Sequence, residues 1–492
     1  MSARIAAFFS TLTLVAAAAI PDSAATSVIE RDVVILGGGA SGAHAAVRLR
    51  EDYNKTIAVV EKKNRLVSLI SFTLIKHQIT CTNAVKGGHV SSYDDPETGK
   101  PYDVGVYSYT DYTGAREFVE RLNIPIQDPV RLSLTTTYAN FDTGKKLNYS
   151  APAYNLTQAG LAKYLTLCEK YEAFILPSYE NFPTASAGIP EDLTLKFSDF
   201  VAKYQLEAAV PRVFQVTGLG MGNLGDMTTL YVMQAFGAPI TRSLLGTIGS
   251  FVPVSLRNQD IYDAIADVLG DDVLYSSTAI KTARTEEGVE VLVKGADNTR
   301  TLIRAKKLLI SFEPTLDNLN GIDIDEQETS IFEKWQWSSV YAGVVSHPSL
   351  PDSTAYTNLN PANWLNLPRT PFVDGFSYLG SDNFRVLVAA TGDLESCEAQ
   401  KMVKKALSNM ADAGTIASLG NERPNIKYWS NHGAMHLHVS PEELKAGFIA
   451  NLYALQGRKS TFFTGGAWTA QFSTILWAYN NQFVLPKLLA EL

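Results

Sequence analysis

The chain has 492 residues, of which 46% are hydrophobic and 19% are charged, so it is long enough to bury more than one domain's core and a large cofactor. The formal net charge of -8 leaves no basic surface for neutralising phosphates, which argues against a nucleic-acid partner. A small-molecule ligand is the better expectation.

Residues 1–25 are predicted to be a signal peptide, which places the protein in the secretory pathway or outside the cell. Arg4 supplies the charged start, residues 5–20 supply the apolar run, and small residues at 23–25 form a cleavage site. A signal anchor is the alternative, but the apolar run is shorter than the roughly 20 residues that cross a bilayer. No later segment is long and apolar enough, so the sequence predicts no transmembrane span in the mature chain.

Entry into the secretory pathway would make three sequons meaningful. Asn54, Asn148 and Asn155 each begin an Asn-x-Ser/Thr pattern, and we predict glycosylation at all three. Only three cysteines are present, and an odd count leaves at least one thiol free. The sequence therefore predicts glycans but no disulfide framework.

The first predicted elements form a βαβ unit. Residues 31–37 and 55–61 read as strands, with a helix starting near Ala40 between them. Gly37, Gly39 and Gly42 fit the G-x-G-x-x-G pattern directly after the first strand. In that pattern the first glycine makes a tight turn, the second lets the backbone approach a pyrophosphate, and the third lets helix pack on strand.

An acidic residue follows at the expected place. Glu61 closes the second strand 19 residues after Gly42, close to the spacing at which a carboxylate accepts hydrogen bonds from a ribose. The pyrophosphate would lie at the amino end of the helix, beside Ala40 and Ser41. The sequence predicts a bound dinucleotide; a simple glycine-rich turn is the alternative.

A second glycine pattern occurs at residues 220–225, after residues 213–217 that are compatible with a strand. No acid follows at the ribose position, so we interpret the segment as a loop and the start of a helix. A nicotinamide site there is the alternative. Without that site, dioxygen is a better candidate for the electron acceptor than NAD(P).

The middle and the end of the chain contain further elements. A helix is predicted over residues 155–174, another over 260–270, and strands over 272–285, 289–295 and 299–311. Residues 459–492 repeat the order of strand, glycine turn and helix. The nucleotide-binding domain is therefore predicted to be assembled from three separated pieces.

These motifs carry a resemblance to a known family. The glycine turn, Glu61, the Gly-Gly-His-Val of residues 87–90 with the following "SSYDDPETGKPYDVGV", and residues 447–488 together resemble the flavin-containing amine oxidase-like superfamily. The likeness is greatest to its fungal β-cyclopiazonate dehydrogenase-like branch. The resemblance implies FAD and an α/β (α+β) fold, in which a Rossmann-like, glutathione-reductase-type domain is interleaved with a substrate domain, as in monoamine oxidase.

The expected domain limits follow from this comparison. Residues 30–110, 240–330 and 440–492 would form the FAD-binding domain, and residues 111–239 and 331–439 the substrate domain. By the resemblance, Gly88 and His89 lie along the cofactor, the Ala279 backbone lies near the adenine, and Gly465 and Gly466 pass the ribityl chain. A helix that begins near Phe472 and Ser473 would direct its positive end at the flavin pyrimidine.

Two departures from the family matter. No Ser-Gly-Cys-Tyr element is present near the carboxyl end, so FAD is expected to be bound non-covalently. No lysine can be assigned to the position beside flavin N5, which puts amine chemistry in doubt.

Residues 67–86 interrupt the family pattern. Removing these 20 residues would restore the run "EKKNRLGGHVSSY", and their codons can be written with intron splice signals. We hypothesise a retained intron in the gene model; a genuine loop insertion is the alternative. The uncharged, β-prone "VSLISFTLI" would favour aggregation if it were exposed.

Histidines near the carboxyl end are candidates for proton transfer. His432 is a candidate general base for an alcohol or amine proton, with a hydrogen-bonded core histidine as the alternative. His436 and His438 alternate along a strand, but no third ligand is evident and we predict no metal site. Trp335, Trp337 and Tyr341 are compatible with a pocket wall, although aromatic residues at this spacing are more often core.

The sequence and the resemblance together predict an FAD-dependent oxidoreductase. Hydride would move from a sizeable apolar secondary metabolite, a terpenoid or alkaloid, to the flavin, giving dehydrogenation or oxidative cyclisation, with dioxygen restoring the flavin. One alternative is a secreted flavin amine oxidase. Another is an FAD-binding protein without turnover because of residues 67–86.

Overall fold

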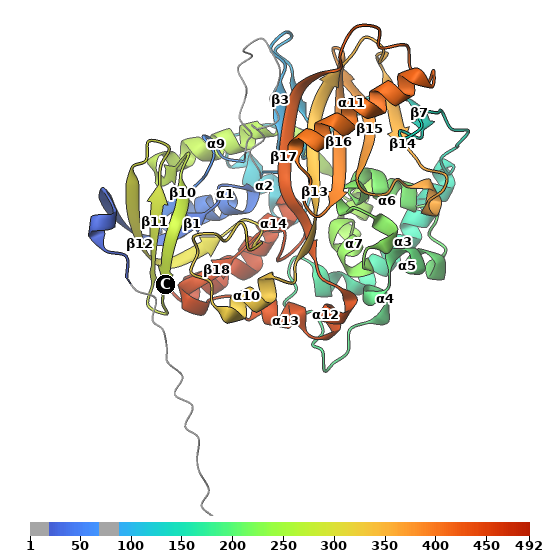
Figure 1. Cartoon of the computed structure of the whole chain (residues 1–492). Helices are drawn as coiled ribbons and strands as arrows, with labels where there is room; N and C mark the ends of the chain where they lie inside the picture. Colours follow the sequence, from blue (N-terminus) through green and yellow to red (C-terminus); the bar gives the residue numbers. More distant parts are fainter. Residues whose placement is uncertain (1–18, 68–87) are drawn as a thin grey trace, which may run out of the picture.

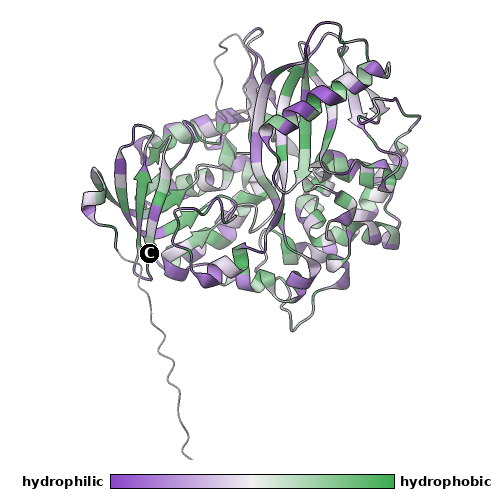
Figure 2. Cartoon of the chain, in the orientation of Figure 1, coloured by the Kyte–Doolittle hydropathy of each residue, from purple (hydrophilic) through white to green (hydrophobic). Residues whose placement is uncertain are grey.

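The structure, a computed structural model, describes residues 19–67 and 88–492. Two large sheets lie next to each other, one built mainly from the two ends and the middle of the chain, the other mainly from residues 336–438 (Figure 1). Hydrophobic residues gather along the strands of both sheets (Figure 2). Both sheets therefore bury an apolar core, as the hydrophobic effect requires.

The first sheet contains the predicted βαβ unit. Its strand order is β10-β11-β12-β1-β2-β9, and β18 also pairs with β12. The last four residues of β1 and all four of β2 are buried, as expected for parallel strands covered on both faces. The strands are β1 Ser27–Leu36, β2 Ile57–Val60, β9 Val273–Leu274, β10 Thr278–Arg284, β11 Val289–Lys294, β12 Arg300–Ile310 and β18 Thr461–Phe463.

Three distant pieces of the chain meet in this sheet. β1 is parallel to both β2 and β12, and β12 is parallel to β18. Helices α1 (Ala40–Val47), α9 (Gln259–Leu269) and α14 (Ser473–Tyr479) pack beside it, and the Trp477 indole nitrogen donates to the Ala40 carbonyl at 3.1 Å. The expected return of the chain to the first sheet is thereby confirmed, as are the predicted starts of α1 and α14. The domain limits given above remain predictions.

The strand predicted over residues 272–285 is wrong in one respect, because it is two strands. β9 pairs with β2, whereas β10 pairs with β11. Ser276 between them has φ of +49°, and the amides of Ser276 and Ser277 donate to the carbonyls of Lys63 and Glu61. A left-handed residue ends a strand, and here it brings residues 277–279 next to Glu61.

The second sheet has the order β17-β13-β16-β15-β14-β7. Helix α11 (Ser396–Asp412) covers one face, where its Val403, Leu407 and Met410 share a buried core with Val386 and Val388 of β16. The strands are β7 Thr135–Ala139, β13 Gln336–Ser346, β14 Thr354–Asn358, β15 Phe372–Gly380, β16 Asn383–Thr391 and β17 Asn425–His438.

Helices below this sheet include the one predicted around residue 165. It is α3, Tyr154–Ile175. Residues 210–216 form helix α6, so a helix and not a strand precedes the second glycine pattern, which supports its interpretation as a loop. The other α-helices in the described part of the chain are α2 Ala115–Glu120, α4 Glu191–Thr194, α5 Phe197–Tyr204, α7 Thr229–Ala235, α8 Ala238–Leu244, α10 Glu326–Phe332, α12 Pro441–Lys445, α13 Phe448–Tyr453 and α15 Leu485–Ala490.

Short strands complete the fold. β3 (Ser92–Asp94) pairs with β4 (Pro101–Asp103), and β8 (Ser250–Pro253) pairs with β5 (Tyr109–Thr110) and β6 (Ile126–Gln127). Within residues 19–67 and 88–492, no helix is both long and apolar enough to cross a bilayer. The three sequon asparagines, Asn54, Asn148 and Asn155, are all exposed, so a glycan on any of them would extend into solvent.

Candidate functional site

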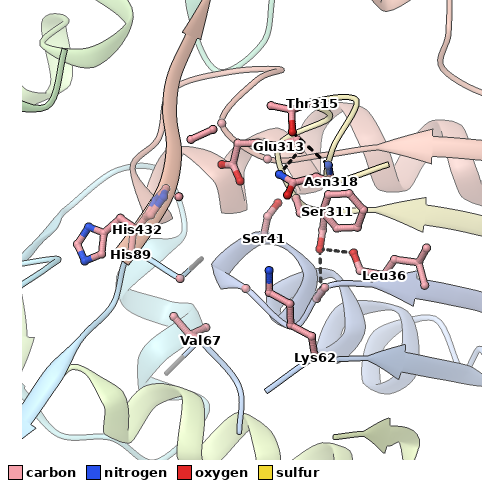
Figure 3. Close-up of a pocket in the computed structure, with 18 of the residues that line it drawn as sticks. Leu36, Ser41, Lys62, Val67, His89, Ser311, Glu313, Thr315, Asn318 and His432 are labelled. Carbon is pink, nitrogen blue, oxygen red and sulfur yellow. Dashed lines mark hydrogen bonds between the residues drawn. The ribbon is translucent and has the colours of Figure 1, made fainter. Parts of the chain in front are cut away.

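A cavity of about 260 Å³ lies where the two sheets face each other (Figure 3). Its wall is formed by the glycine turn after β1, the end of β2, the chain after β12, the segment after β18, and strands β13 and β17. The open end of a sheet, beyond the carboxyl ends of parallel strands, is where ligands bind in α/β folds. This cavity is therefore the candidate cofactor and substrate site.

The glycine turn has the geometry that its pattern predicts. A Cβ added to Gly39 would meet no atom within 4 Å, so this residue leaves open space at the cavity wall. A Cβ on Gly42 would lie 2.1 Å from the Gly37 carbonyl oxygen and 2.4 Å from the Ser311 hydroxyl. The second glycine thus permits close approach of a ligand, and the third permits close packing of α1.

Glu61 lines the cavity and is only 7% exposed. One carboxylate oxygen accepts from the Gly38 amide at 2.7 Å, and the other accepts from the Lys63 amide at 2.9 Å. Each carboxylate oxygen has a second lone pair. Glu61 can therefore hold the glycine turn and still accept hydrogen bonds from a ribose.

Most of the predicted site residues lie in the wall of this one cavity. Gly42 and Phe472 are the exceptions: Gly42 packs beneath the turn, and Phe472 precedes α14 without contributing to the wall. The predicted residues that do line it are Gly37, Gly39, Ala40, Ser41, Glu61, Gly88, His89, Ala279, His432, Gly465, Gly466 and Ser473. Their assigned roles toward a ligand remain predictions.

Two histidines face each other in the wall. The ring centroids of His89 and His432 are 5.7 Å apart, and their ring planes are inclined at 43° (Figure 3). Burial, with smaller effects from His89 and Lys63, lowers the pKa of His432 to about 3. Its Nε2 is buried without a hydrogen-bond partner among the described residues. His432 is thus a neutral imidazole with an unused nitrogen in the cavity wall.

Gln471 is a site residue that the sequence did not indicate. Both its amide oxygen and its amide nitrogen are buried without a partner in the described structure, and the residue lines the cavity. A Cβ on Gly466 would lie 2.3 Å from the Gln471 Cγ, so the glycine lets this side chain pack tightly. A buried amide without partners is costly. A bound ligand is the simplest partner for it.

The second sheet contributes the other wall of the cavity. Trp337 and Ser339 of β13 and Asn431 and Ala434 of β17 all line it. Trp335 instead packs on Phe448, and Tyr341 stacks on Trp429 with ring centroids 5.6 Å apart. Of the three aromatic residues considered, Trp337 alone reaches the cavity.

His436 and His438 do not follow a regular strand. His436 has φ of +52°, and its backbone carbonyl is 2.7 Å from Nδ1 of His438. His438 packs on Tyr231, whereas His436 lies beside Gly220. Among the residues that the structure describes, no three His, Cys, Asp or Glu side chains are grouped to hold a metal ion.

The cavity fits a flavin dinucleotide. The open glycine at residue 39 leaves room for a pyrophosphate, Glu61 retains acceptor capacity for a ribose, and the Gln471 amide and the His432 Nε2 lack partners at the other end. Unpaired buried polar groups of this kind indicate a ligand that pairs with them. The residues that would hold FAD are those of the glycine turn, Glu61, Ala279 and the segment 465–473.

Comparisons with known proteins agree with this fold. No protein-family model matches the chain. Among solved structures, a fatty acid isomerase from P. acnes has a TM-score of 0.68 at 18% identity. The match includes 93% of this chain and 98% of the isomerase chain. A cyclohexylamine oxidase from Brevibacterium oxydans has a TM-score of 0.61 at 16% identity, and the match includes 94% of this chain and 99% of the oxidase chain. The fold is thus the two-domain fold of the amine oxidase-like flavoenzymes.

Curated relatives are similar over nearly the whole chain. β-Cyclopiazonate dehydrogenase of Aspergillus oryzae is 34% identical, with 98% of each chain covered. An FAD-dependent oxidoreductase of Cochliobolus heterostrophus is also 34% identical, with 94% of this chain and 92% of that protein covered. The molecule is therefore an FAD-dependent oxidoreductase. It belongs to the family of fungal flavoenzymes that includes β-cyclopiazonate dehydrogenase.

Proposed function

We propose that this enzyme removes a hydride from a carbon atom of a sizeable, mostly apolar secondary metabolite, a terpenoid or an alkaloid, and so dehydrogenates or cyclises it. The observation that carries the proposal is the continuity of the cavity. The same space extends from Glu61 to Trp337 on the second sheet. A substrate larger than the adenosine part of the dinucleotide can thus bind in the same cavity, next to the cofactor site.

The part of the wall assigned to the substrate supports an apolar molecule with few polar groups. Leu394 and Ala434 offer apolar contacts, and Trp337 offers an aromatic face. Ser339 and Asn431 are buried, with 5% exposure each, and offer a small number of hydrogen-bonding groups. Such a wall orients a large apolar substrate and excludes water from the reacting atoms.

Bound FAD supplies the acceptor for the hydride. The contribution of His432 would be to accept a proton at Nε2 from a hydroxyl or N–H group of the substrate. That nitrogen is unpartnered among the described residues, and the lowered pKa of His432 keeps the imidazole neutral at physiological pH. His89, whose ring lies 5.7 Å from that of His432, would restrict the orientations open to the His432 imidazole.

A flavin amine oxidase is the rival function within the fold. The described lysines of the cavity wall are Lys62 and Lys63, both next to Glu61 on the cofactor side. Neither lies on the second sheet, where the substrate would be. This placement favours oxidation of a carbon centre over amine oxidation, in agreement with the relatives named dehydrogenase and oxidoreductase.

Anaerobic reduction of the purified yellow protein tests the proposal. Candidate terpenoids and alkaloids are added one at a time, and bleaching of the flavin absorbance is followed. We expect bleaching with at least one such metabolite and none with simple primary amines. Bleaching by amines alone would establish the amine oxidase, and bleaching by no donor would support a flavin-binding protein without turnover. Metabolite profiling of a deletion strain then identifies the accumulating substrate.

The role of His432 is tested with His432→Gln. We expect a loss in the rate of flavin reduction of about 10²-fold or more, the usual contribution of a general base, while FAD content stays unchanged. His347→Gln, a buried histidine outside this cavity, is the matched control. Equal effects of the two substitutions would remove His432 from the mechanism.

Three further expectations belong to this proposal. FAD is bound non-covalently, so acid precipitation should release the chromophore into the supernatant. Dioxygen restores the flavin, so air should return the yellow colour with formation of hydrogen peroxide. The chain enters the secretory pathway, so the protein should be recovered with its first 25 or so residues removed, as amino-terminal sequencing would show.

A further inference from the structure

Four buried polar side chains join the first helix to the last segment of the chain. Ser41 and His44 lie on α1, Thr464 follows β18, and Asn480 follows α14. None of the four is more than 3% exposed. Polar groups buried this deeply are stable only when they are hydrogen-bonded to each other, and we call this group the Ser41–Asn480 network.

The hydrogen bonds of the network have a defined direction. The Asn480 side-chain amide donates to the Ser41 backbone carbonyl at 2.8 Å, so its oxygen faces Thr464. The Thr464 hydroxyl donates to that oxygen at 2.6 Å. A hydroxyl has a single hydrogen. The Ser41 hydroxyl, 2.7 Å from the Thr464 oxygen, must therefore be the donor of that pair.

His44 and Trp477 strengthen the same junction. The Asn480 amide nitrogen lies 3.3 Å from Nδ1 of His44, and burial holds the pKa of His44 well below its usual range, so this nitrogen is free to accept. Trp477 stacks on the His44 ring and also donates to the Ala40 carbonyl. Trp477 of α14 and Asn480, which follows that helix, therefore bind the first turn of α1 at two successive carbonyls, those of Ala40 and Ser41.

This direction has a consequence for the cofactor. Ser41 lines the cavity at the amino end of α1, but its one hydroxyl hydrogen is used by Thr464. A phosphate at this place would find backbone N–H groups of the turn and not the serine hydroxyl. Thr464 is also followed directly by Gly465 and Gly466, which line the same cavity.

We propose that Thr464 and Asn480 are positioning residues for FAD. Through the Ser41 hydroxyl they hold the glycine turn next to the segment at Gly465, so that residues from both ends of the chain bind the same cofactor. The inference concerns cofactor binding and is independent of the substrate. It also assigns to the Ser41 side chain a partner within the protein in place of a contact with the diphosphate.

A double-mutant cycle tests the inference. FAD is removed from the purified holoprotein, and the dissociation constant of added FAD is measured by fluorescence for the parent, Ser41→Ala, Thr464→Val and the double variant. We expect each single change to weaken FAD binding about tenfold, a plausible effect of losing one buried hydrogen bond. The FAD dissociation constant of the double variant should lie within about twofold of that of the weaker-binding single variant, because both changes break the same hydrogen-bonded link.

Independent effects would overturn the inference. If Ser41→Ala weakens binding while Thr464→Val does not, or if the two losses multiply, the Ser41 hydroxyl contacts the cofactor itself. Two neutral single variants would also overturn it. Should Thr464→Val fail to fold, the cycle is run with Asn480→Asp, which removes the donor to the Ser41 carbonyl and has nearly the same shape.

Two further variants separate positioning from general stability. Thr464→Ser retains the hydroxyl and should restore FAD affinity to within about twofold of the parent, a rescue that depends on the hydrogen bond. Thr461→Val is the matched control, because Thr461 begins the strand that Thr464 follows, is fully buried, and donates to the Lys459 carbonyl outside the network. We expect Thr461→Val to change the urea midpoint and leave the dissociation constant of FAD unchanged. A loss of FAD affinity in this control equal to that of Thr464→Val would overturn the positioning role.

Discussion

Single residues at the cavity do two tasks at once. Glu61 accepts from the backbone amides of Gly38 and Lys63 and so stabilises the turn that it also borders. A carboxylate that accepts two backbone hydrogen bonds is held in a fixed orientation. The acid predicted to bind a ribose is therefore part of the scaffold before any ligand arrives.

Gln471 gives the first prediction at this scale. Gln471→Met keeps the shape of the side chain but removes the amide, whose two polar atoms lack partners among the described residues. We expect FAD to bind about tenfold more weakly or the flavin midpoint potential to shift, because a hydrogen bond from the protein to the ligand is lost. Fluorescence titration and spectroelectrochemistry measure the two quantities.

Gln400→Met is the matched control for this substitution, since Gln400 is a buried glutamine that lies on α11, away from the cavity. An unchanged affinity and potential for Gln471→Met, together with a raised KM, would assign the amide to the substrate instead.

The second prediction concerns the pH dependence of stability. The pKa of His432 is lowered to about 3 in the folded protein, whereas it is near 6.5 in an unfolded chain. Between these pH values the unfolded state binds more protons, so the free energy of unfolding falls as the pH falls from about 6.5 toward about 3. His432→Gln should make this dependence shallower by about one proton. Urea unfolding of the apoprotein at several pH values between 4.5 and 7.5 measures the slope. Equal slopes for parent and variant would contradict the pKa shift.

At the scale of elements, a buried ion pair joins β10 to α10. Arg284 donates to both carboxylate oxygens of Glu328 at 2.7 and 2.8 Å, and the two side chains are 0% and 2% exposed. Glu328 also completes the capping box of α10 with Asp325. The pair therefore fixes the helix that follows the cavity-lining segment 313–322.

Glu328→Gln gives the prediction for this element. Asp323 still pairs with the buried guanidinium at 2.8 Å after this substitution, so we expect the free energy of unfolding to fall by about 1.5–3 kcal/mol, the usual contribution of a hydrogen bond to a charged group. Urea denaturation followed by circular dichroism measures this loss. Glu326→Gln, an exposed residue of the same helix, should change stability by less than about 0.5 kcal/mol. A similar small effect at both positions would show that the pair contributes little.

Elements with a strong local pattern were predicted well. β1, α1 and β2 follow from apolar runs and a glycine turn, and the start of α14 follows from the tail pattern. The division between β9 and β10 could not be predicted, because Ser276 adopts its left-handed conformation through bonds to Lys63, far away in the chain. Long-range pairing decided that boundary.

At the scale of the whole molecule, the segment 67–86 raises a question of assembly. Residues 68–87 lie outside the described structure, but their neighbours do not. A Cβ on Gly88 would lie 2.4 Å from the Val67 carbonyl oxygen, and both residues line the cavity. Val67 and Gly88, on the two sides of this segment, thus lie next to each other, and this geometry permits the segment between them to be removed.

Excision of residues 67–86 gives the prediction at this scale. We expect the shortened protein to fold and to contain at least as much FAD as the full chain, with less aggregation, because a β-prone apolar run is gone. The ratio of flavin to protein absorbance and size-exclusion chromatography measure both effects. A colourless or insoluble product would show that the segment is a genuine part of the enzyme. Absence of splice dinucleotides at the ends of the corresponding gene segment would exclude a retained intron.

The sequence by itself determined a dinucleotide-binding βαβ unit, because the glycine turn and Glu61 lie within one short segment where local geometry is fixed by residue type and spacing. FAD and the two-domain fold class followed from the resemblance to the flavin-containing amine oxidase-like superfamily. Twelve residues that the sequence and the resemblance indicated, from Gly37 to Ser473, line the cavity. Only the tertiary structure decided that Gln471 and Asn431 join the wall and that Ser41 binds Thr464. These contacts unite residues hundreds of positions apart, or turn side chains toward a shared space, and their partners are chosen by the packing of two sheets and not by any local pattern.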